Sequence, residues 1–228
     1  MKKIYFIILY FFPKAAMTQI PATGSWIAIQ SPVNLSKKWQ WHNDAGYRTL
    51  GVSLSAYQFL FRTGVRYNFN TKWSVATGTA FFYTRSSYQK FNREFGGEFR
   101  IWQEFNAQHP VSKTISLQNR LRSEQRWFSA TDNRAEYFGF RFRYRVAATK
   151  NLTEKWAIQL ANEYMRQAVD DKFSFNQNRL LGTVLYKINT STLLQGGYMW
   201  LKWPSSSQHI MTFTFQKVIS LHGIKREN

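Results

Sequence analysis

Residues 138–146 read FGFRFRYRV, so that aromatic and charged side chains alternate. Because successive side chains of a β-strand point to opposite faces, this stretch predicts a strand with one apolar face and one face of arginines. The same period of two residues is clear in 39–47, 59–69, 73–83, 95–105, 115–127 and 156–164, and weaker in 179–188, 191–203 and 209–219. The sequence lacks the spacing of three to four residues that marks an amphipathic helix, and it therefore predicts an all-β fold.

Length and composition indicate a folded protein. With 228 residues, 44% hydrophobic and 18% aromatic, the chain can close a barrel and does not have the composition of a disordered polyelectrolyte. The absence of cysteine excludes a disulfide scaffold, a thiolate metal site and a cysteine nucleophile. The formal net charge of +19 raises nucleic-acid binding as a function. A base-stacking site needs aromatic and basic side chains on one face, whereas residues 140–145 place them on opposite faces, so we expect no nucleic-acid partner.

The first eighteen residues have the pattern of a secretory signal peptide. Lys2 and Lys3 precede an apolar run at 4–12, which Pro13 ends before a pair of alanines. The run is too short to span a bilayer as a helix, which takes about 20 residues. We therefore expect a signal peptide at 1–18 and an exported barrel domain at 19–228; the alternative is a buried N-terminal strand.

The connections between the alternating stretches differ in length. Short turns are expected at 35–37, 70–72, 110–113, 149–155 and 189–191, and longer polar connections at 49–55, 85–93, 128–133, 168–173 and 204–208. Four of the five short turns place a lysine beside the strand start, which gives a weak repeat of roughly 40 residues. Short turns on one rim and longer loops on the other are typical of an up-and-down antiparallel barrel.

Counting strands from 39 to 219 gives ten, an even number as in bacterial single-chain barrels. Both ends of such a barrel lie on the short-turn rim, which is expected to face the periplasm. Residues 26–34 then form a partial strand, a segment inside the lumen, or part of a twelve-stranded arrangement.

The composition of the two faces distinguishes a membrane barrel from a soluble one. A soluble barrel keeps its apolar face inside and carries mostly lysine and glutamate outside. Here one face is rich in Arg, Gln, Ser, Gly and Glu while the other carries Phe, Trp and Tyr, which is typical of a polar lumen and a lipid-facing exterior. Residues 73–83 span a height of about 25 Å at roughly 3.3 Å per residue and a tilt near 40°, as does the apolar band of an outer-membrane barrel. The sequence thus predicts a transmembrane β-barrel in the cell outer membrane of a Gram-negative bacterium.

Aromatic residues near the strand ends predict the girdles that mark the two membrane interfaces. One girdle comprises Trp39, Trp73 and Trp156, which follow short turns, and the other comprises Tyr83, Trp127, Tyr164 and Trp203. The simpler explanation of these positions is that tryptophan and tyrosine favour strands in general.

The polar face predicts a network of charges in the lumen. Its members are Arg120, Arg122, Glu124, Arg126, Arg141, Arg143, Arg145, Glu98, Arg100, Glu163 and Arg179, and the same face carries Arg48, Arg62, Arg66, Asp44, Glu94 and Glu104. Buried charges must be paired, and we expect Glu124 to bridge Arg122, Arg126 and the arginines of 141–145. Such a network can fill a narrow lumen and fix the strand register, or its surplus arginines can select anions.

Several stretches resemble one uncharacterised family. They are Trp26, the turn at 35–39, the runs at 121–127 and 140–144, and the late 178–180; the most specific is the Arg-x-Glu-x-Arg-Trp run at 122–127. Over nearly the whole exported chain, the sequence resembles the domain-of-unknown-function family 2490, common in Bacteroidetes. The resemblance implies export and insertion into the outer membrane, and it brings no known activity or catalytic residues. Residues 213–215 are similar to the aromatic-x-aromatic ending read by barrel assembly machinery, although the chain continues to Asn228.

Catalytic patterns are weak. His42, His109, His209 and His222 have no metal-ligand spacing, and Glu98 and Glu104 are about 20 Å apart along a strand, too far for a glycosidase pair. Ser207 with His209 is the one pair that a membrane-embedded acyl hydrolase would use. We predict no catalytic residue, metal site or cofactor.

These observations together predict an outer-membrane barrel with no enzymatic activity, either a narrow anion-preferring pore or a structural or ligand-binding barrel. The alternative is a membrane-embedded lipid-modifying enzyme. Expected partners are outer-membrane lipid and lipopolysaccharide, met by basic loop residues such as Arg85, Lys90 and Arg93, and also the barrel assembly machinery and an anionic small solute.

Overall fold

The structure is a computed structural model, and it describes residues 22–51, 55–85, 94–132 and 134–221. The predicted signal peptide at 1–18 lies outside these residues, as do Lys90, Arg93 and His222. The described chain forms β-strands and no helix, which confirms the predicted all-β fold. Within those ranges there is accordingly no helix of the length and hydropathy needed to cross a membrane.

The strands match the alternating stretches of the sequence and extend beyond most of them. Their bounds are β1 (Thr23–Gln30), β2 (Val33–Asn34), β3 (Trp39–Thr49), β4 (Ala56–Asn68), β5 (Trp73–Arg85), β6 (Phe95–Pro110), β7 (Ile115–Phe128), β8 (Tyr137–Asn151), β9 (Trp156–Val169), β10 (Lys172–Asn189), β11 (Thr192–Lys202), β12 (Ser207–Lys217) and β13 (Ile219–Ser220).

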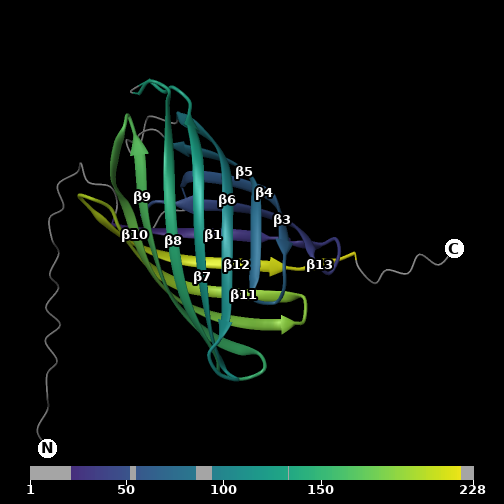
Figure 1. The fold of residues 1–228 in the computed structure, drawn as a ribbon. Coiled ribbons are helices and arrows are strands. Elements are labelled where there is room, and N and C mark those ends of the chain that lie inside the picture. Colours follow the sequence, from purple (N-terminus) through teal and green to yellow (C-terminus); the bar gives the residue numbers. More distant parts are fainter. Residues whose placement is uncertain (1–21, 52–54, 86–93, 133, 222–228) are drawn as a thin grey trace, which may run out of the picture.

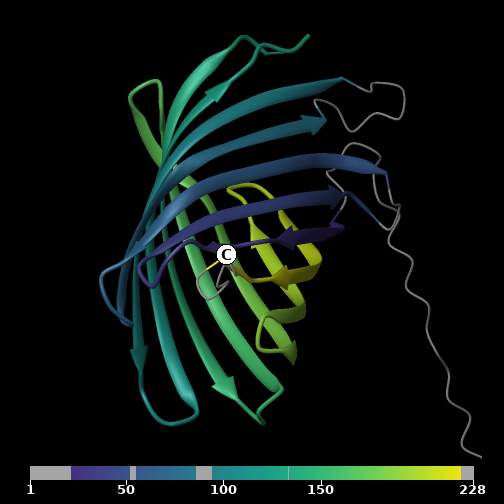
Figure 2. The ribbon, with the colours of Figure 1, turned by 90° about the vertical axis from the view of Figure 1, so that its right-hand side faces the viewer.

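The sheet closes on itself as a barrel of eleven strands (Figures 1 and 2). From β3 to β12, neighbours in the chain pair in antiparallel fashion. The first strand, β1, completes the ring by pairing antiparallel with β3 and parallel with β12. The short β2 and β13 pair with each other beyond the ends of β1 and β12. The predicted count of ten or twelve is therefore wrong, because β1 is a wall strand and not a partial strand or a lumenal segment.

The odd strand count places the two ends of the barrel on opposite rims. The carbonyl of Thr23, where β1 starts, accepts a hydrogen bond from the backbone N–H of Gly51 in the connection after β3, at 2.7 Å. The last strand ends instead at the short-turn rim, beside Val33 and Asn34. In an up-and-down sequence of eleven strands the first and last run in the same direction, so their pairing is parallel. The prediction that both ends share the short-turn rim is wrong for this reason.

Four short turns repeat one hydrogen-bond arrangement. In the turn before β5, Oδ1 of Asn70 accepts bonds from the backbone N–H groups of Lys72 and Trp73, at 2.8 and 2.9 Å. Ser36, Ser112 and Thr153 make the equivalent pair of bonds before β3, β7 and β9. A short polar side chain that accepts from the backbone two and three residues ahead stabilises a tight turn. The weak sequence repeat therefore corresponds to a repeated turn structure.

The connection between β9 and β10 differs from its prediction. Instead of a long polar loop at 168–173, Asp170 and Asp171 form a two-residue turn, with φ angles of 49° and 58°. Two consecutive residues with positive φ form the type I′ turn, whose twist matches that of the flanking strands. The connections on the rim opposite the short turns are therefore not all long, because the β9–β10 hairpin is tight.

The alternation of residues determines which face points inward. Phe61 and Phe142 point outward and are 48% and 50% exposed, whereas Arg141 and Glu124 point inward and are 4% and 2% exposed. The apolar side chains therefore lie outside and the charged ones inside, as the sequence predicted.

A small apolar cluster also lies inside the barrel, and the sequence did not predict it. It comprises Leu60, Ala76, Ala80, Phe82 and Trp102. The ring of Trp102 lies against the wall at Gly64 and Gly78, where a Cβ atom would approach the ring to 2.6 and 2.7 Å. The two glycines therefore make room for the indole.

Substituting Gly78 with alanine is expected to lower the free energy of unfolding by about 1–3 kcal/mol, the usual cost of overpacking. The new methyl group would lie 2.7 Å from Trp102 and closer still to the backbone of Gly64. Gly196→Ala is the matched control, because nothing lies within 4 Å of its Cβ position, and we expect a change within about 0.5 kcal/mol. Urea unfolding in detergent micelles measures both; equal midpoints would contradict the packing described.

Candidate functional site

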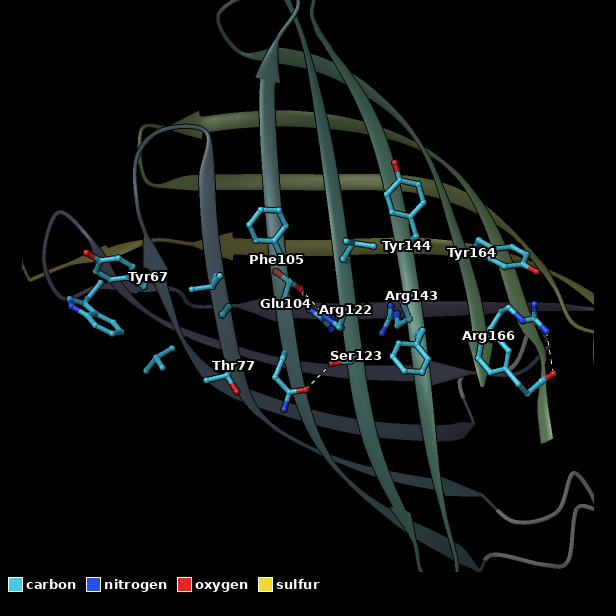
Figure 3. Close-up of a pocket in the computed structure, with 18 residues that line it drawn as sticks. Tyr67, Thr77, Glu104, Phe105, Arg122, Ser123, Arg143, Tyr144, Tyr164 and Arg166 are labelled. Carbon is cyan, nitrogen blue, oxygen red and sulfur yellow. Dashed lines mark hydrogen bonds and ion pairs between the residues drawn. The ribbon is translucent and has the colours of Figure 1, made fainter. Parts of the chain in front are cut away.

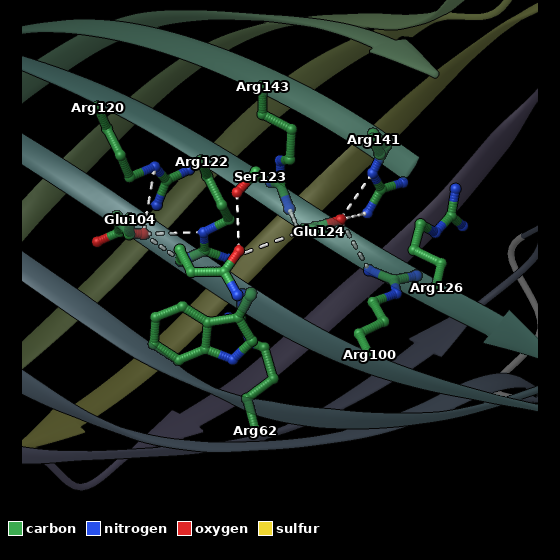
Figure 4. Close-up of polar contacts among 12 residues, drawn as sticks. Arg62, Arg100, Glu104, Arg120, Arg122, Ser123, Glu124, Arg126, Arg141 and Arg143 are labelled. Atoms are coloured by element: carbon green, nitrogen blue, oxygen red, sulfur yellow. Dashed lines mark hydrogen bonds and ion pairs between the residues drawn. The ribbon is translucent and has the colours of Figure 1, made fainter. Parts of the chain in front are cut away.

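The charge network in the lumen has Glu124 of β7 at its centre (Figure 4). Nη1 of Arg143 donates to its Oε1 at 2.6 Å, and Nε of Arg141 donates to its Oε2 at 2.7 Å. Arg100 and Arg122 lie farther from the same carboxylate, at 3.7 and 3.9 Å. The register explains the arrangement, because Glu124 pairs with Arg141 across β7 and β8, and inward residues recur at every second position.

Four more carboxylates share the remaining arginines. Glu163 binds Arg120, Arg143 and Arg179; Glu104 binds Arg66, Arg120 and Arg122; Glu98 binds Arg100 and Arg126; and Asp44 binds Arg62. The closest contacts include Arg120 to Glu163 at 2.6 Å and Arg126 to Glu98 at 2.6 Å. Several pairs join strands that are not neighbours, such as β7 with β9, so the network spans more than one hairpin.

All eleven residues of the predicted network lie on strands β6–β10 and point inward, and ten of them make ion pairs there. Arg145 is the exception, since its guanidinium donates to Gln118 at 3.5 Å and to Gln159 at 2.8 Å. Arg126, expected to bind Glu124, binds Glu98 instead. The pairs therefore follow cross-strand geometry, which alternation alone does not specify.

Two carboxylates differ from their expected roles. Glu94 precedes β6 and accepts a hydrogen bond from the backbone N–H of Asp132 at 3.2 Å, so it lies at the rim of the barrel. Glu104 was expected on the inner face but not as a network member, and it binds three arginines. Its cross-strand partner in the register is Arg122, and the recurring inward positions of β6 and β7 were the signal for this pair.

Arg48 is, with Arg145, one of the two described inner-face arginines that make no ion pair in the network. Among the described residues it makes no ion pair with a carboxylate; its Nη1 donates to Oε1 of Gln58 at 2.5 Å. Its guanidinium stacks 3.7 Å from the ring centre of Trp26. Arg179 of β10 reaches the same ring at 4.9 Å, although β11 and β12 separate β10 from β1. Trp26 was not predicted as a lumen residue, because β1 was not recognised as a wall strand.

Contacts between side chains of separated strands cross the interior. Arg179 meets Trp26 as described above, and the ring of His42 on β3 meets Trp102 on β6 edge-on at 6.4 Å. The inner face carries eleven arginines and five carboxylates in the described strands, a surplus of six positive charges. The interior is therefore crowded and strongly basic.

The predicted aromatic girdle residues lie on the outward face with one exception. Trp39, Trp73 and Trp156 begin β3, β5 and β9, while Tyr83, Trp127 and Tyr164 lie toward the other ends of β5, β7 and β9; all six are exposed. Trp203 lies just beyond β11 in the connection to β12, where it is half-buried.

A groove of about 870 Å³ crosses the outward face of β3–β10 (Figure 3). We call it the outer groove. Tyr67 lies at one end and Arg166 at the other. Polar side chains on its floor form hydrogen bonds with each other, including Ser123 Oγ to Oε1 of Gln103 at 2.8 Å. Sequence analysis did not predict this feature, because it depends on which residues of eight strands come to lie side by side.

Among the described residues, Ser207 and His209, the candidate hydrolase pair, form no hydrogen bond with each other. Nδ1 of His209 hydrogen-bonds to the hydroxyl of Tyr198 at 2.5 Å, across β11 and β12. Ser207 lies two residues away on β12. In the described ranges, no group of three or more His, Asp or Glu side chains is placed to hold a metal ion.

The comparisons with known proteins identify a family and no characterised relative. Neither the curated proteins nor the solved structures contain a match. The family model described as "Protein of unknown function (DUF2490)" matches residues 23–209, which run from the first residue of β1 into β12. Because this match covers most of the chain, the protein belongs to the DUF2490 family of proteins of unknown function.

Proposed function

We propose that the protein is an outer-membrane β-barrel with a closed lumen, which serves as a structural or ligand-binding protein of the membrane. The outward face supports this location. It exposes large apolar side chains on every wall strand from β3 to β12, and aromatic residues lie near the strand ends. In water such a continuous apolar surface would drive aggregation, whereas a bilayer solvates it.

The observation that carries the closed lumen is that most of the interior charges pair with each other. Nine arginines share five carboxylates, and Trp102 and Phe82 fill space beside them. An open pore keeps its charged side chains in water, where each ion pair is weak. Buried pairs at 2.6–2.8 Å, such as those of Arg143 with Glu124 and Glu163, instead resist separation by a passing ion.

The surplus of arginines favours a second candidate, a narrow anion-preferring pore. Rings of arginine or lysine select anions in known pores, and Arg48 and Arg145 lack carboxylate partners among the described residues. In this alternative the same residues bind a permeating anion. Lipid modification is the third candidate, for which the pair of Tyr198 and His209 on the outward face is the starting point.

Fractionation followed by electrical recording tests these candidates. We expect the protein in the outer-membrane fraction, with a gel band that shifts on heating, and no conductance steps after reconstitution into a planar bilayer. Recovery in the soluble fraction would overturn the location. Anion-selective conductance that disappears when Arg141, Arg143 and Arg145 are replaced by glutamine would establish the pore instead, and hydrolysis of added lipid would establish the enzyme.

A further inference from the structure

The outer groove runs obliquely from one rim of the barrel toward the other. Its first row of side chains is largely apolar and follows the register through Tyr67, Val75, Phe105, Leu121, Tyr144 and Tyr164. Tyr67 is next to the last residue of β4, at the short-turn rim, whereas Tyr164 lies in the far half of β9. The row therefore crosses the apolar band at an angle, because the pairing direction is perpendicular to tilted strands.

The second row of the groove is more polar. In register order it contains Val65, Thr77, Gln103, Ser123, Phe142 and Arg166. Gln103 also donates to the side chain of Gln125 at 3.2 Å. Amides and hydroxyls are unusual on an apolar outward face, because hydrocarbon offers them no partners. The hydroxyl of Thr77 donates to the backbone carbonyl of Trp102 at 3.0 Å, so these side chains are largely satisfied within the protein, and a ligand with hydrogen-bonding groups would meet the lone pairs that remain on their oxygens.

Arg166 ends the polar row without an anionic partner. Its Nη2 donates to the carbonyl of Phe173 at 3.2 Å, and its guanidinium lies 4.1 Å from the ring centre of the same residue. Within the described ranges no carboxylate pairs with it, and its buried Nε has no hydrogen-bond partner. Most arginines inside the barrel pair with a carboxylate, whereas the outward guanidinium of Arg166 does not. A buried, unpaired donor is costly, and an anion in the groove would remove that cost.

We propose that the outer groove binds a phosphate-bearing lipid, with the phosphate at Arg166 and the acyl chains along the apolar row. Guanidinium groups suit phosphate oxygens because they offer several donors in a fixed plane. The proposal rests on the proposed function, since it requires the outward face to lie in a bilayer. Arg166 lies three residues before the end of β9, which places it near the headgroups, and Ser123 lies two strands away in the same row. The volume of about 870 Å³ is in the usual range for ligand sites.

Native mass spectrometry of the detergent-solubilised barrel tests the site with one phosphate-bearing lipid. We expect wild-type protein to bind dioleoyl phosphatidylglycerol about tenfold more tightly than Arg166→Gln, because one charge-assisted contact is lost. Lys150→Gln is the matched control, since Lys150 is an exposed cation near the other end of β8 and outside the groove. A second variant, Leu121→Asn, is expected to weaken binding by impairing the apolar row while leaving Arg166 intact.

Three outcomes would overturn the lipid site. Equal binding by wild type and Arg166→Gln would remove Arg166 from it. Displacement of the lipid by excess inorganic phosphate would indicate a site for a free anion. A dimer that becomes monomeric in Arg166→Gln would make the groove an interface between two copies. If Arg166→Gln still shows a heat-shifted band in the outer-membrane fraction in any of these cases, the proposed function stands and this inference alone fails.

Discussion

Replacing Glu124 with alanine is expected to lower the free energy of unfolding by about 3–5 kcal/mol, the usual cost of removing one partner from a buried ion pair. Glu124 is 2% exposed, and four arginines approach its carboxylate. Without it, Arg141 loses the carboxylate to which it donates, and Arg143 keeps Glu163. The uncompensated positive charge in a crowded interior is the physical reason for the large effect.

Urea titration in detergent micelles, followed by tryptophan fluorescence and by the heat-shifted gel band, measures this loss. Glu154→Ala is the matched control, because Glu154 is exposed in the turn before β9 and we expect a change within about 0.5 kcal/mol. Glu124→Gln should fall between the two, since it keeps the volume and one acceptor but not the charge. Wild-type stability in Glu124→Ala would mean that water in the lumen solvates these arginines, which contradicts a closed interior.

Replacing Trp102 with alanine is expected to cost about 3–5 kcal/mol as well, through a different mechanism. The indole is 2% exposed, lies over Gly64 and Gly78, and faces the guanidinium of Arg122 at 4.9 Å. Its removal leaves a cavity that the two glycines cannot fill, because they carry no side chains. The loss therefore combines the transfer free energy of the ring with the energy of the cavity.

Trp156→Ala provides the comparison for Trp102→Ala. Trp156 is 47% exposed on the outward face. Much of its ring contacts detergent in the folded barrel, and its removal leaves no buried cavity. We therefore expect Trp156→Ala to lower the free energy of unfolding by less than half as much as Trp102→Ala. The same urea titration measures both variants. Equal losses would show that Trp102 is not packed in the interior. Trp102→Phe, which returns part of the ring to the cavity, is expected to lose less stability than Trp102→Ala.

Residue alternation was sufficient to predict most of the wall. A strand of the type seen in β8 needs only its own residues to be recognised, because Phe142 and Arg143 point to opposite faces whatever their neighbours are. The inward positions of the charges follow in the same way. The short turns were also predictable, since Asn70 and its counterparts act within three residues of themselves.

Features that depend on remote segments were not predictable in this way. β1 pairs with β12, and Trp26 there faces an arginine from β10. The choice of Glu98 over Glu124 by Arg126 depends on the register of β6 against β7. The outer groove requires residues of eight strands, β3 to β10, to lie side by side.

The sequence by itself determined the all-β fold, the inner and outer faces of each strand and the family. These properties depend on the period of two residues and on local motifs, and no distant contact changes them. Only the tertiary structure decided the eleven-stranded closure with its parallel pair, the partners of each arginine and the position of Arg166 at the end of a groove. The physical reason is that ring closure and register are set by the number, tilt and stagger of all the strands together, which no single stretch of sequence contains.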